Sequence, residues 1–542
     1  MPSPRMAAAS SASKRRWPAL PFWLARPLSL VNAFDYAARR FAGRAAFVQG
    51  EERIDYAAAA AFSHRVAAGL GRQLARGDKV AVLSPNEAWS FIAVLGILRG
   101  GFVWLPINAR NALADTIAQV DDFDCDCLLY HSSFEADVAR IRASVPRIRL
   151  LLCLDRPGQA APALRDWLAD APATAPPLDL AADEVCMMFG TGGTTGRSKG
   201  VMLMHRNVMA MIGNFLAAMP YGEPPVYLAA APLTHAAGFM CFWIMATGGS
   251  TIVLPTANPR AVMQAIEQHR VTTLFLPPTV IYMMLADPEV RHYDYRSLKH
   301  FIYGAAPMAA DKLKEAVAVF GPCMAQGYGQ VEAPCSLTFL PPEEHRLNGD
   351  ATSERRLTSC GRAMPYSEVA IMDDAGHLLG PEQAGEIVAR GDLVMLGYYK
   401  NPEATAETAA HGWHHTGDVG LMDADGFVYI VDRKKDMVIT GGFNVYPSEV
   451  ERVLWSHPAV QDCAVIGVPD EKWGEAVKAI IELKPDATAS EADLLALCRV
   501  RLGGVKAPKS VEFWPQLPRS PVGKVLKRAI RERFWAGRAR QI

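Results

Sequence analysis

The chain has 542 residues, half of them apolar, and its 56 Lys and Arg residues balance 56 Asp and Glu residues. This length exceeds a single ordinary hydrophobic core and predicts two or more domains. A formal net charge of zero gives no electrostatic support for a nucleic-acid-binding protein. We therefore expect no nucleic-acid partner.

Cysteine usage and the N-terminal composition indicate the compartment. The ten cysteines include no CxxC pair, and the closest two, Cys125 and Cys127, have no His or Cys pair at zinc spacing. A reduced, cytoplasmic protein fits this usage. No run of 18 apolar residues predicts a membrane span. Residues 1–27 are basic without an acid, which predicts a mobile tail whose contact with membranes is at most peripheral.

The first part of the chain alternates helical and strand patterns. Residues 35–41 and 56–74 have helical spacing, residues 79–83 read as a buried strand, and a helix over 87–99 ends at Gly100-Gly101. Further short apolar runs follow at 103–106, 128–130 and 150–152. Strand, helix and strand at this spacing predict a parallel α/β sheet.

A glycine-rich segment dominates the chemistry of the sequence. Residues 189–201 read Phe-Gly-Thr-Gly-Gly-Thr-Thr-Gly-Arg-Ser-Lys-Gly-Val and follow a short apolar run. Glycines allow backbone N–H groups to surround an anion, while threonine hydroxyls and a lysine add donors for phosphate. The spacing excludes both a P-loop and the dinucleotide-binding GxGxxG pattern. The segment therefore predicts a polyphosphate-binding loop; a flexible surface loop is the alternative.

Other segments of small, charged or aromatic residues follow at intervals. They are Pro-Leu-Thr-His at 232–235, Gly-Ala-Ala-Pro at 304–307, Gln-Gly-Tyr-Gly-Gln-Val-Glu at 326–332, Trp-His-His-Thr-Gly-Asp at 413–418, a charged run at 432–436, and Pro-Arg-Ser-Pro-Val-Gly-Lys-Val at 518–525. Taken singly, each fits an ordinary turn, a solvated face or surface decoration. Residues 448–451 predict a capping box that opens a helix, and residues 490–502 predict a second capped helix.

In this order, the segments resemble the AMP-forming adenylate superfamily, which includes acyl-CoA synthetases, adenylation domains and firefly luciferase. The resemblance covers roughly residues 30–535. It implies an α/β fold with a large N-terminal domain of stacked α/β subdomains, over residues 28–432, and a small mobile α/β domain over 433–542. The segments at 385–388 and 397–399 match the family in a small β-rich subdomain. Gly192, Ser198 and Val331 depart from the usual residues of the family.

The resemblance also implies the roles of individual residues. Lys524 is the catalytic lysine, Glu332 binds Mg²⁺ together with Thr191, and His235 lies at the mouth of the acyl pocket. Tyr328 stacks on adenine, Asp418 accepts the ribose hydroxyls, Arg433 contacts ribose, and Lys435 is the hinge. The remaining residues expected to bind nucleotide or CoA are Gly192, Gly193, Thr194, Thr195, Gly196, Lys199, Gly304, Ala305, Ala306, Gly329, Gly441, Gly442 and Lys509. His414 and His415 are interpreted as structural, because adjacent residues of a strand point in opposite directions.

The implied reaction uses ATP, Mg²⁺ and coenzyme A. A carboxylate attacks the α-phosphate to give acyl-AMP and pyrophosphate, and a thiol then attacks the acyl carbonyl and releases AMP. Rotation about Lys435 would exchange Lys524 for the face at Gly441-Gly442 between the two steps.

The expected function is an acyl-CoA ligase for an apolar carboxylic acid, with a medium- or long-chain fatty acid favoured, because the residues around the expected pocket are small and uncharged. An aromatic or alicyclic acid is the second option. An acyl-AMP ligase that loads a carrier protein, a luciferase-like oxygenase and a non-catalytic nucleotide-binding module stay open. The sequence leaves the oligomeric state open, with a homodimer as one option.

Overall fold

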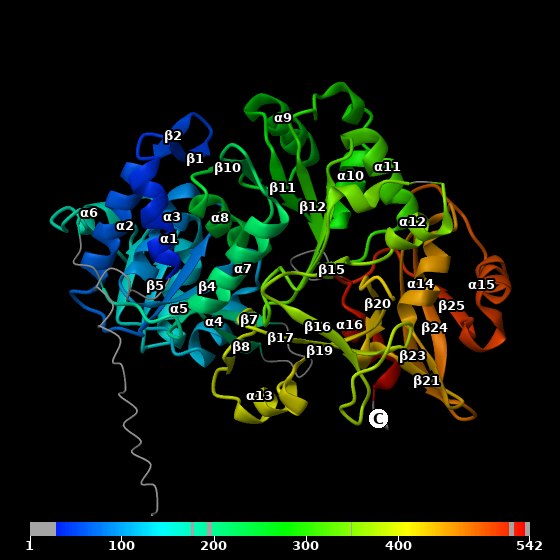
Figure 1. The fold of residues 1–542 in the computed structure, drawn as a ribbon. Helices are drawn as coiled ribbons and strands as arrows, with labels where there is room; N and C mark the ends of the chain where they lie inside the picture. The colour runs from blue at the N-terminus through cyan, green and yellow to red at the C-terminus, as the bar shows by residue number, and fades with distance from the viewer. Residues whose placement is uncertain (1–28, 175–177, 192–197, 348, 520–524, 537–542) are drawn as a thin grey trace, which may run out of the picture.

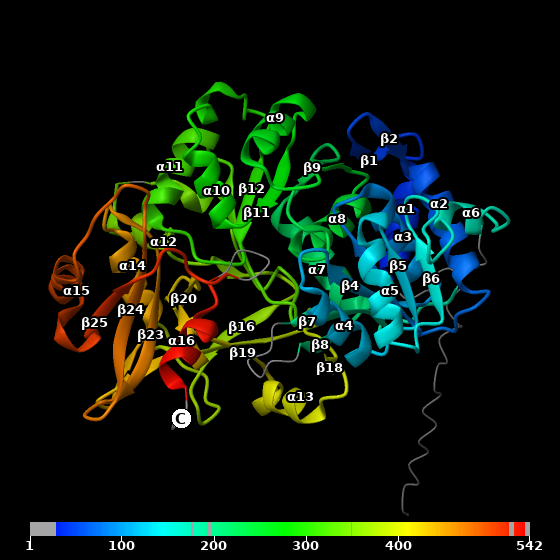
Figure 2. The ribbon, with the colours of Figure 1, turned by 180° about the vertical axis from the view of Figure 1, so that it is seen from behind.

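The computed structural model describes residues 29–174, 178–191, 198–347, 349–519 and 525–536. In this part of the chain the strands form four sheets. Figure 1 shows the blue and cyan N-terminal region on one side, the green middle region beside it, and the orange and red C-terminal region on the other side. The view from behind in Figure 2 shows the same order.

The first sheet is formed mainly by the N-terminal third of the chain. Its order is β18 (Gly397–Tyr398), β8 (Lys199–Met204), β7 (Val185–Thr191), β4 (Val103–Asn108), β3 (Lys79–Ser84), β5 (Cys127–Tyr130) and β6 (Leu150–Cys153). Its strands β4, β3, β5 and β6 are parallel and almost wholly buried, as expected for a sheet covered on both faces.

The second sheet carries one edge of the site. Its order is β15 (Arg362–Ala363), β14 (Thr338–Leu340), β13 (Met324–Tyr328), β12 (His300–Gly304), β11 (Thr273–Leu276), β9 (Val226–Ala229), β10 (Ser250–Val253), β1 (Ala45–Gln49) and β2 (Glu52–Asp55). Strands β11, β12 and β13 are parallel, so their carboxyl ends meet at one edge, where α/β sheets bind ligands.

Helices separate these two sheets and cover their outer faces. Apolar helices α3 (Ala88–Arg99) and α8 (Ala236–Ala246) are buried almost throughout, and α3 contacts both sheets. Such all-round apolar helices are typical of the middle layer of a fold. The other helices of the region are α1 (Leu30–Arg40), α2 (Tyr56–Leu70), α4 (Leu113–Asp122), α5 (Glu135–Ser144), α6 (Leu164–Trp167), α7 (His205–Ala218), α9 (Pro259–His269), α10 (Pro278–Leu285), α11 (Ala310–Phe320), α12 (Ala351–Arg356) and α13 (Pro402–Thr408).

A small antiparallel sheet follows, in the order β16 (Glu368–Met372), β17 (Gly385–Arg390), β19 (His414–Met422) and β20 (Val428–Arg433). It matches the expected β-rich subdomain for residues 385–388. The expectation for Gly397 and Tyr398 was wrong, because β18 instead pairs with β8 at the edge of the first sheet. That pairing brings Tyr398 beside the base of the glycine-rich loop.

The C-terminal region has its own sheet and its own buried clusters. Strands β22 (Phe443–Val445), β21 (Val438–Thr440), β24 (Gly474–Leu483), β23 (Val460–Asp470) and β25 (Ser510–Phe513) pack with α14 (Pro447–Trp455), α15 (Glu491–Lys506) and α16 (Lys527–Trp535). Its two buried hydrophobic clusters contain only residues 438–530, and the clusters of the larger region end at residue 429. The fold is therefore mixed α/β with a large and a small part.

The helix starts predicted at Tyr56, Glu87 and Ser490 are confirmed. In contrast, α1 begins at Leu30 instead of Asp35, and α2 ends at Leu70 instead of Leu74. Glu87 caps α3 through its side chain, and Ser490 and Asp493 form a capping box at α15. The capping box predicted at 448–451 does not form. Pro447 already begins α14, and Ser448 donates its hydroxyl to the Val431 carbonyl instead. Glu451 turns inward and accepts the Val465 N–H at 2.7 Å.

Within the described ranges, no helix combines the length and the apolar character needed to cross a membrane.

Candidate active site

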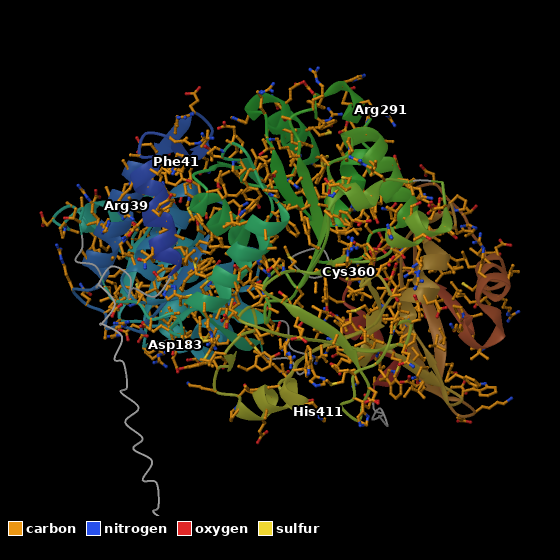
Figure 3. The ribbon with its side chains drawn as sticks, in the orientation of Figure 1. Arg39, Phe41, Asp183, Arg291, Cys360 and His411 are labelled. Atoms are coloured by element: carbon orange, nitrogen blue, oxygen red, sulfur yellow. The ribbon has the colours of Figure 1, made fainter. Side chains whose placement is uncertain are left out.

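A cavity of about 3490 Å³ lies where the carboxyl ends of β12 and β13 meet the β7–β8 hairpin, the small sheet and the C-terminal region. It is several times larger than the ~300–1,000 Å³ of a common small-molecule pocket. Figure 3 labels two of its residues, the buried Cys360 in the middle of the molecule and His411 at its lower side, whose ring centroid lies 5.9 Å from that of His415. A cavity of this volume can hold a large ligand made of several linked groups.

The turn after β12 leaves space against bare backbone. A Cβ added at Gly304 would lie 2.5 Å from the Gly327 carbonyl oxygen, so the close approach of β12 and β13 requires glycine. Ala305 follows with a φ of +66°, a left-handed conformation that is strained for alanine. Ala305 and Ala306 both line the cavity, as predicted, and offer a flat, small-residue surface there.

Tyr328 and Asp418, predicted to bind the nucleoside, are in direct contact. The Tyr328 hydroxyl donates to Asp418 Oδ2 at 2.7 Å, and Arg433 Nε lies 2.6 Å from Asp418 Oδ1. Burial, reinforced by the Asp418 charge, raises the pKa of Tyr328 far above its usual value, so the phenol stays protonated. Both carboxylate oxygens of Asp418 therefore have protein donors, and a ribose would exchange with them.

Gln330 joins this cluster and is a residue that the sequence reasoning missed. Its amide nitrogen donates to the Thr416 carbonyl at 2.7 Å and to Asp418 Oδ2 at 3.2 Å. Its amide oxygen accepts from His414 Nε2 at 3.2 Å, and burial lowers the His414 pKa to about 4, which keeps the ring neutral. The segment 326–332 was recognised, but no sequence signal assigned a partner to Gln330.

The phosphate side of the cavity carries Thr191, Lys199 and Glu332. The Lys199 ammonium lies 4.9 Å from the ring centroid of Tyr398, and the Tyr398 hydroxyl donates to Glu332 Oε1 at 2.9 Å. Tyr398 was therefore also missed; its place in the chain gave no hint that it pairs with Glu332. Gly192, Gly193, Thr194, Thr195 and Gly196 lie outside the described residues, so their predicted phosphate contacts stay predictions.

Glu332 fits the predicted magnesium role. Mg²⁺ takes one or two protein carboxylates and completes its shell with phosphate oxygens and water. Glu332 lines the cavity near Lys199, and its Oε2 makes no hydrogen bond to the described residues. The described parts of the chain contain no group of three metal-binding side chains, so a cation here would need ligands from the nucleotide. Thr191 is directed elsewhere, since its hydroxyl donates to the Lys199 carbonyl at 3.5 Å.

His235 is the N-cap residue of α8 and lines the cavity together with Ala236 and Ala237. Its Nδ1 shares a hydrogen bond of 3.0 Å with the Thr234 hydroxyl. The segment beyond it, α8, is entirely apolar. His235 lies where this apolar helix begins, and its place at the mouth of an acyl pocket stays a prediction.

Ion pairs fill the wall that the C-terminal region contributes. Arg519 pairs with Asp462 at 2.7 Å and with Glu482 at 3.3 Å. Lys527 pairs at 2.7 Å with Glu451, a residue only 4% exposed. Burial raises the pKa of Glu451, and the Lys527 ammonium opposes that rise. Arg519 and Lys527 flank the segment that carries Lys524, which itself lies outside the described residues.

The charged run at the junction is paired to both sides. Lys434, in the short η5 turn (Lys434–Asp436), pairs with Asp374 at 2.7 Å and with Glu386 at 3.1 Å. Asp436 pairs with Arg531 of α16 at 3.0 Å. Lys435 lies between them in the sequence and lines the cavity, and its role as a hinge stays a prediction.

Gly441, Gly442 and Lys509 do not join the other predicted residues, because none of them lines the cavity. Gly441 has a φ of +58° and donates its N–H to the Trp473 carbonyl at 2.9 Å. Lys509 is exposed, and its ammonium donates to the Gly504 carbonyl at 2.6 Å. Their predicted contacts with CoA require another arrangement of the C-terminal region.

Comparison with known proteins identifies the architecture. Residues 34–399 match the family model of AMP-binding enzymes, and residues 449–524 match that of the AMP-binding enzyme C-terminal domain. The chain is 41% identical over 371 residues to a medium/long-chain-fatty-acid–CoA ligase of Mycobacterium tuberculosis, covering 67% of this chain and 64% of that protein. It is 36% identical to a feruloyl-CoA synthase of Amycolatopsis sp, covering 90% and 95% of the two chains. The crystal structure of ATP-bound MatB from Rhodopseudomonas palustris superposes with a TM-score of 0.84 at 31% identity, covering 94% of this chain and 99% of that one.

A large domain of several sheets that faces a small α/β domain across such a cavity defines the adenylate-forming class of enzymes. Within that class, the chain belongs to the AMP-binding enzyme family.

Proposed function

We propose that the protein is an AMP-forming acyl-CoA ligase that activates an apolar carboxylic acid with ATP and transfers the acyl group to coenzyme A. The observation that carries the proposal is the continuity of one cavity from the polar cluster of Lys199, Glu332 and Asp418 to the apolar face of α8. The relatives named above include fatty-acid and feruloyl-CoA ligases, which supports an acid with an apolar body.

The residues of the polar part of the cavity bind the nucleotide in this proposal. Asp418 and Arg433 hold the ribose, and the turn at Gly304, Ala305 and Ala306 receives the adenine ring. Lys199 and the glycine-rich loop neutralise the phosphates, since phosphoryl chemistry needs charge compensation and alignment more than a protein nucleophile. Glu332 would hold Mg²⁺, which would supply further charge neutralisation at the phosphates.

The domains 28–432 and 433–542 are proposed to move relative to each other about Lys435. Arg519, Val525 and Lys527, which flank the segment of Lys524 in the sequence, line the cavity, and this supports a role of Lys524 in acyl-adenylate formation. Gly441 and Gly442 do not line the cavity. Transfer to CoA would therefore need a rotation of the C-terminal domain that brings the face with these two glycines to the cavity.

The test is release of pyrophosphate and AMP from ATP and Mg²⁺ with fatty, aromatic and alicyclic acids, each with and without CoA. Acid-dependent pyrophosphate release together with a CoA thioester is the expected result. Release of pyrophosphate without a CoA thioester would mean that the acceptor is a carrier protein instead of CoA. ATP binding without turnover of any acid would contradict the proposed function.

An aromatic acid is the second candidate, favoured by the feruloyl-CoA synthase similarity and by a stacked pair of rings, Phe189 and Phe239, whose centroids lie 4.9 Å apart on the cavity wall. The same panel of acids separates the two candidates.

A further inference from the structure

The apolar end of the cavity is formed by successive layers of side chains on one face of the second sheet. Strands β11, β12 and β13 pair in register, with Ile302 beside Phe275 and beside Ala325. Because side chains alternate along a strand, Gly304, Ile302 and His300 share one face of β12. Gly304 and Ile302 line the cavity, whereas His300, one layer further down, does not.

A hydrogen-bonded cluster, here called the floor, lies next to Ile302 along this face. The Tyr221 hydroxyl lies 2.7 Å from His300 Nδ1 and also contacts the Thr273 hydroxyl, the neighbour of His300 in the sheet. These partners come from three separate segments of the chain. The polar groups of this floor satisfy one another, and burial lowers the His300 pKa to about 4, so the ring is neutral. The three side chains of the floor are themselves uncharged; the nearby Lys299 ammonium lies 5.6 Å from the Tyr221 ring centroid.

Trp243 of α8 contacts both this floor and a residue of the cavity wall. Its ring lies 5.9 Å from that of Tyr221 and 5.6 Å from that of Phe215, and Phe215 lines the cavity. Trp243 is fully buried, and its indole N–H has no hydrogen-bond partner among the described residues. Replacing Trp243 by a smaller apolar side chain would therefore reduce the side-chain volume at this position without breaking a hydrogen bond.

We propose that Trp243, resting on the Tyr221–His300–Thr273 floor, closes the distal end of the acyl pocket and sets the longest acid that the enzyme accepts. This inference rests on the proposed function and narrows its substrate class. From Gly304 to His300 the strand advances by only ~13 Å. The pocket then takes medium-length straight chains, such as octanoate and decanoate, and excludes palmitate and stearate.

The unaltered enzyme already tests the limit. We expect kcat/KM to rise from hexanoate to decanoate and to fall steeply by palmitate, since one methylene too many in a closed apolar pocket changes the rate by roughly tenfold or more. Equal activity on octanoate and stearate would overturn the proposal, because a closed floor cannot admit both. If no acid supports adenylate formation, the proposed function fails instead, and the two failures are thus distinguishable.

Variants of Trp243 test whether this residue sets the chain-length limit. Trp243→Leu is expected to raise the palmitate-to-octanoate ratio of kcat/KM at least ~tenfold. The matched control is Phe242→Leu, which removes a buried ring that packs on Phe91 and Trp104 instead. Its ratio should stay unchanged. If Trp243→Leu fails to fold, Tyr221→Leu, at a half-buried position, provides the same test. An unchanged ratio in a folded variant of either residue would contradict the proposal.

Discussion

The two walls of the cavity are built in different ways. The wall from the large domain combines strand ends, bare backbone at Gly304 and apolar side chains such as Phe239 and Ile302 with a smaller polar part that includes Glu332 and Asp418. The wall from the C-terminal domain consists of ion pairs, including Arg519 with Asp462 and Lys527 with Glu451. Close packing fixes shape and suits recognition of a substrate, whereas ion pairs can exchange partners and suit a surface that moves.

The largest expected effect separates the two halves of the reaction. Lys524→Ala should lower acyl-adenylate formation about 10³-fold, because it removes the positive charge proposed for the α-phosphate. Thioester formation from supplied acyl-AMP should persist. Rapid-quench assays of each half measure both rates.

Lys509→Ala is the matched control, since this exposed lysine lies outside the cavity and should leave adenylate formation unchanged. If Lys524→Ala lowered the rates of adenylate formation and of thioester formation equally, the proposed specific role of this part of the C-terminal wall in the first step would be wrong.

The second effect concerns the stability of the charged wall. Lys527→Ala leaves the buried carboxylate of Glu451 without its ion-pair partner and should cost about 3 kcal/mol in unfolding free energy. Chemical denaturation of the full chain measures this loss.

The double variant Lys527→Met with Glu451→Gln should regain most of that stability, because it removes both charges together while the amide oxygen of the introduced glutamine can still accept the Val465 N–H. A Lys527→Ala variant as stable as the parent would show that this pair contributes nothing to the domain.

The third effect is a pH dependence that arises in the closely packed domain. Burial lowers the pKa of His205, His345 and His414 from 6.5 to about 4. Between these values the unfolded chain binds more protons than the folded one, so stability is full above pH 6.5 and is lost as the pH falls toward 4. Each histidine can contribute about 3 kcal/mol at most.

Thermal unfolding between pH 7 and pH 4.5 measures this dependence. His205→Gln should flatten the curve, and a parent curve that is already flat over this range would contradict the neutral burial of these rings.

The smallest effect concerns the nucleoside end of the site. Tyr328→Phe removes the hydroxyl that donates to Asp418 and should raise the KM for ATP by roughly tenfold, because one hydrogen bond to a charged group is worth about 1.5 kcal/mol or more.

Tyr303→Phe is the matched control: its hydroxyl is equally buried but bonds His345, 3.1 Å away. The same rise in KM in both variants would mean that the Tyr328 hydroxyl acts through general packing.

The sequence predicted much of this fold because the relevant signals are local. The apolar run at 79–83 became β3, and Gly100 caps the C-terminus of α3. The site residues Tyr328, Glu332 and Asp418 were likewise found from short motifs, and the structure brings them to one cavity.

What the sequence could not predict depends on contacts between distant segments. Tyr221 and His300 are 79 residues apart, and Tyr398 and Glu332 are 66 apart, so no local pattern links them. The capping box at 448–451 failed for the same reason: Glu451 has better partners in Val465 and Lys527 than the end of its own helix.

The most direct test of the central claim, that one cavity activates an acid and then passes it to a thiol, is a single-turnover experiment. Enzyme, ATP, Mg²⁺ and decanoate are mixed without CoA, the bound products are identified by mass spectrometry, and CoA is then added. We predict one acyl-AMP per active site, converted on addition of CoA to acyl-CoA with release of AMP. Formation of ADP in place of acyl-AMP, or an acyl-AMP that does not react with CoA, would contradict the account.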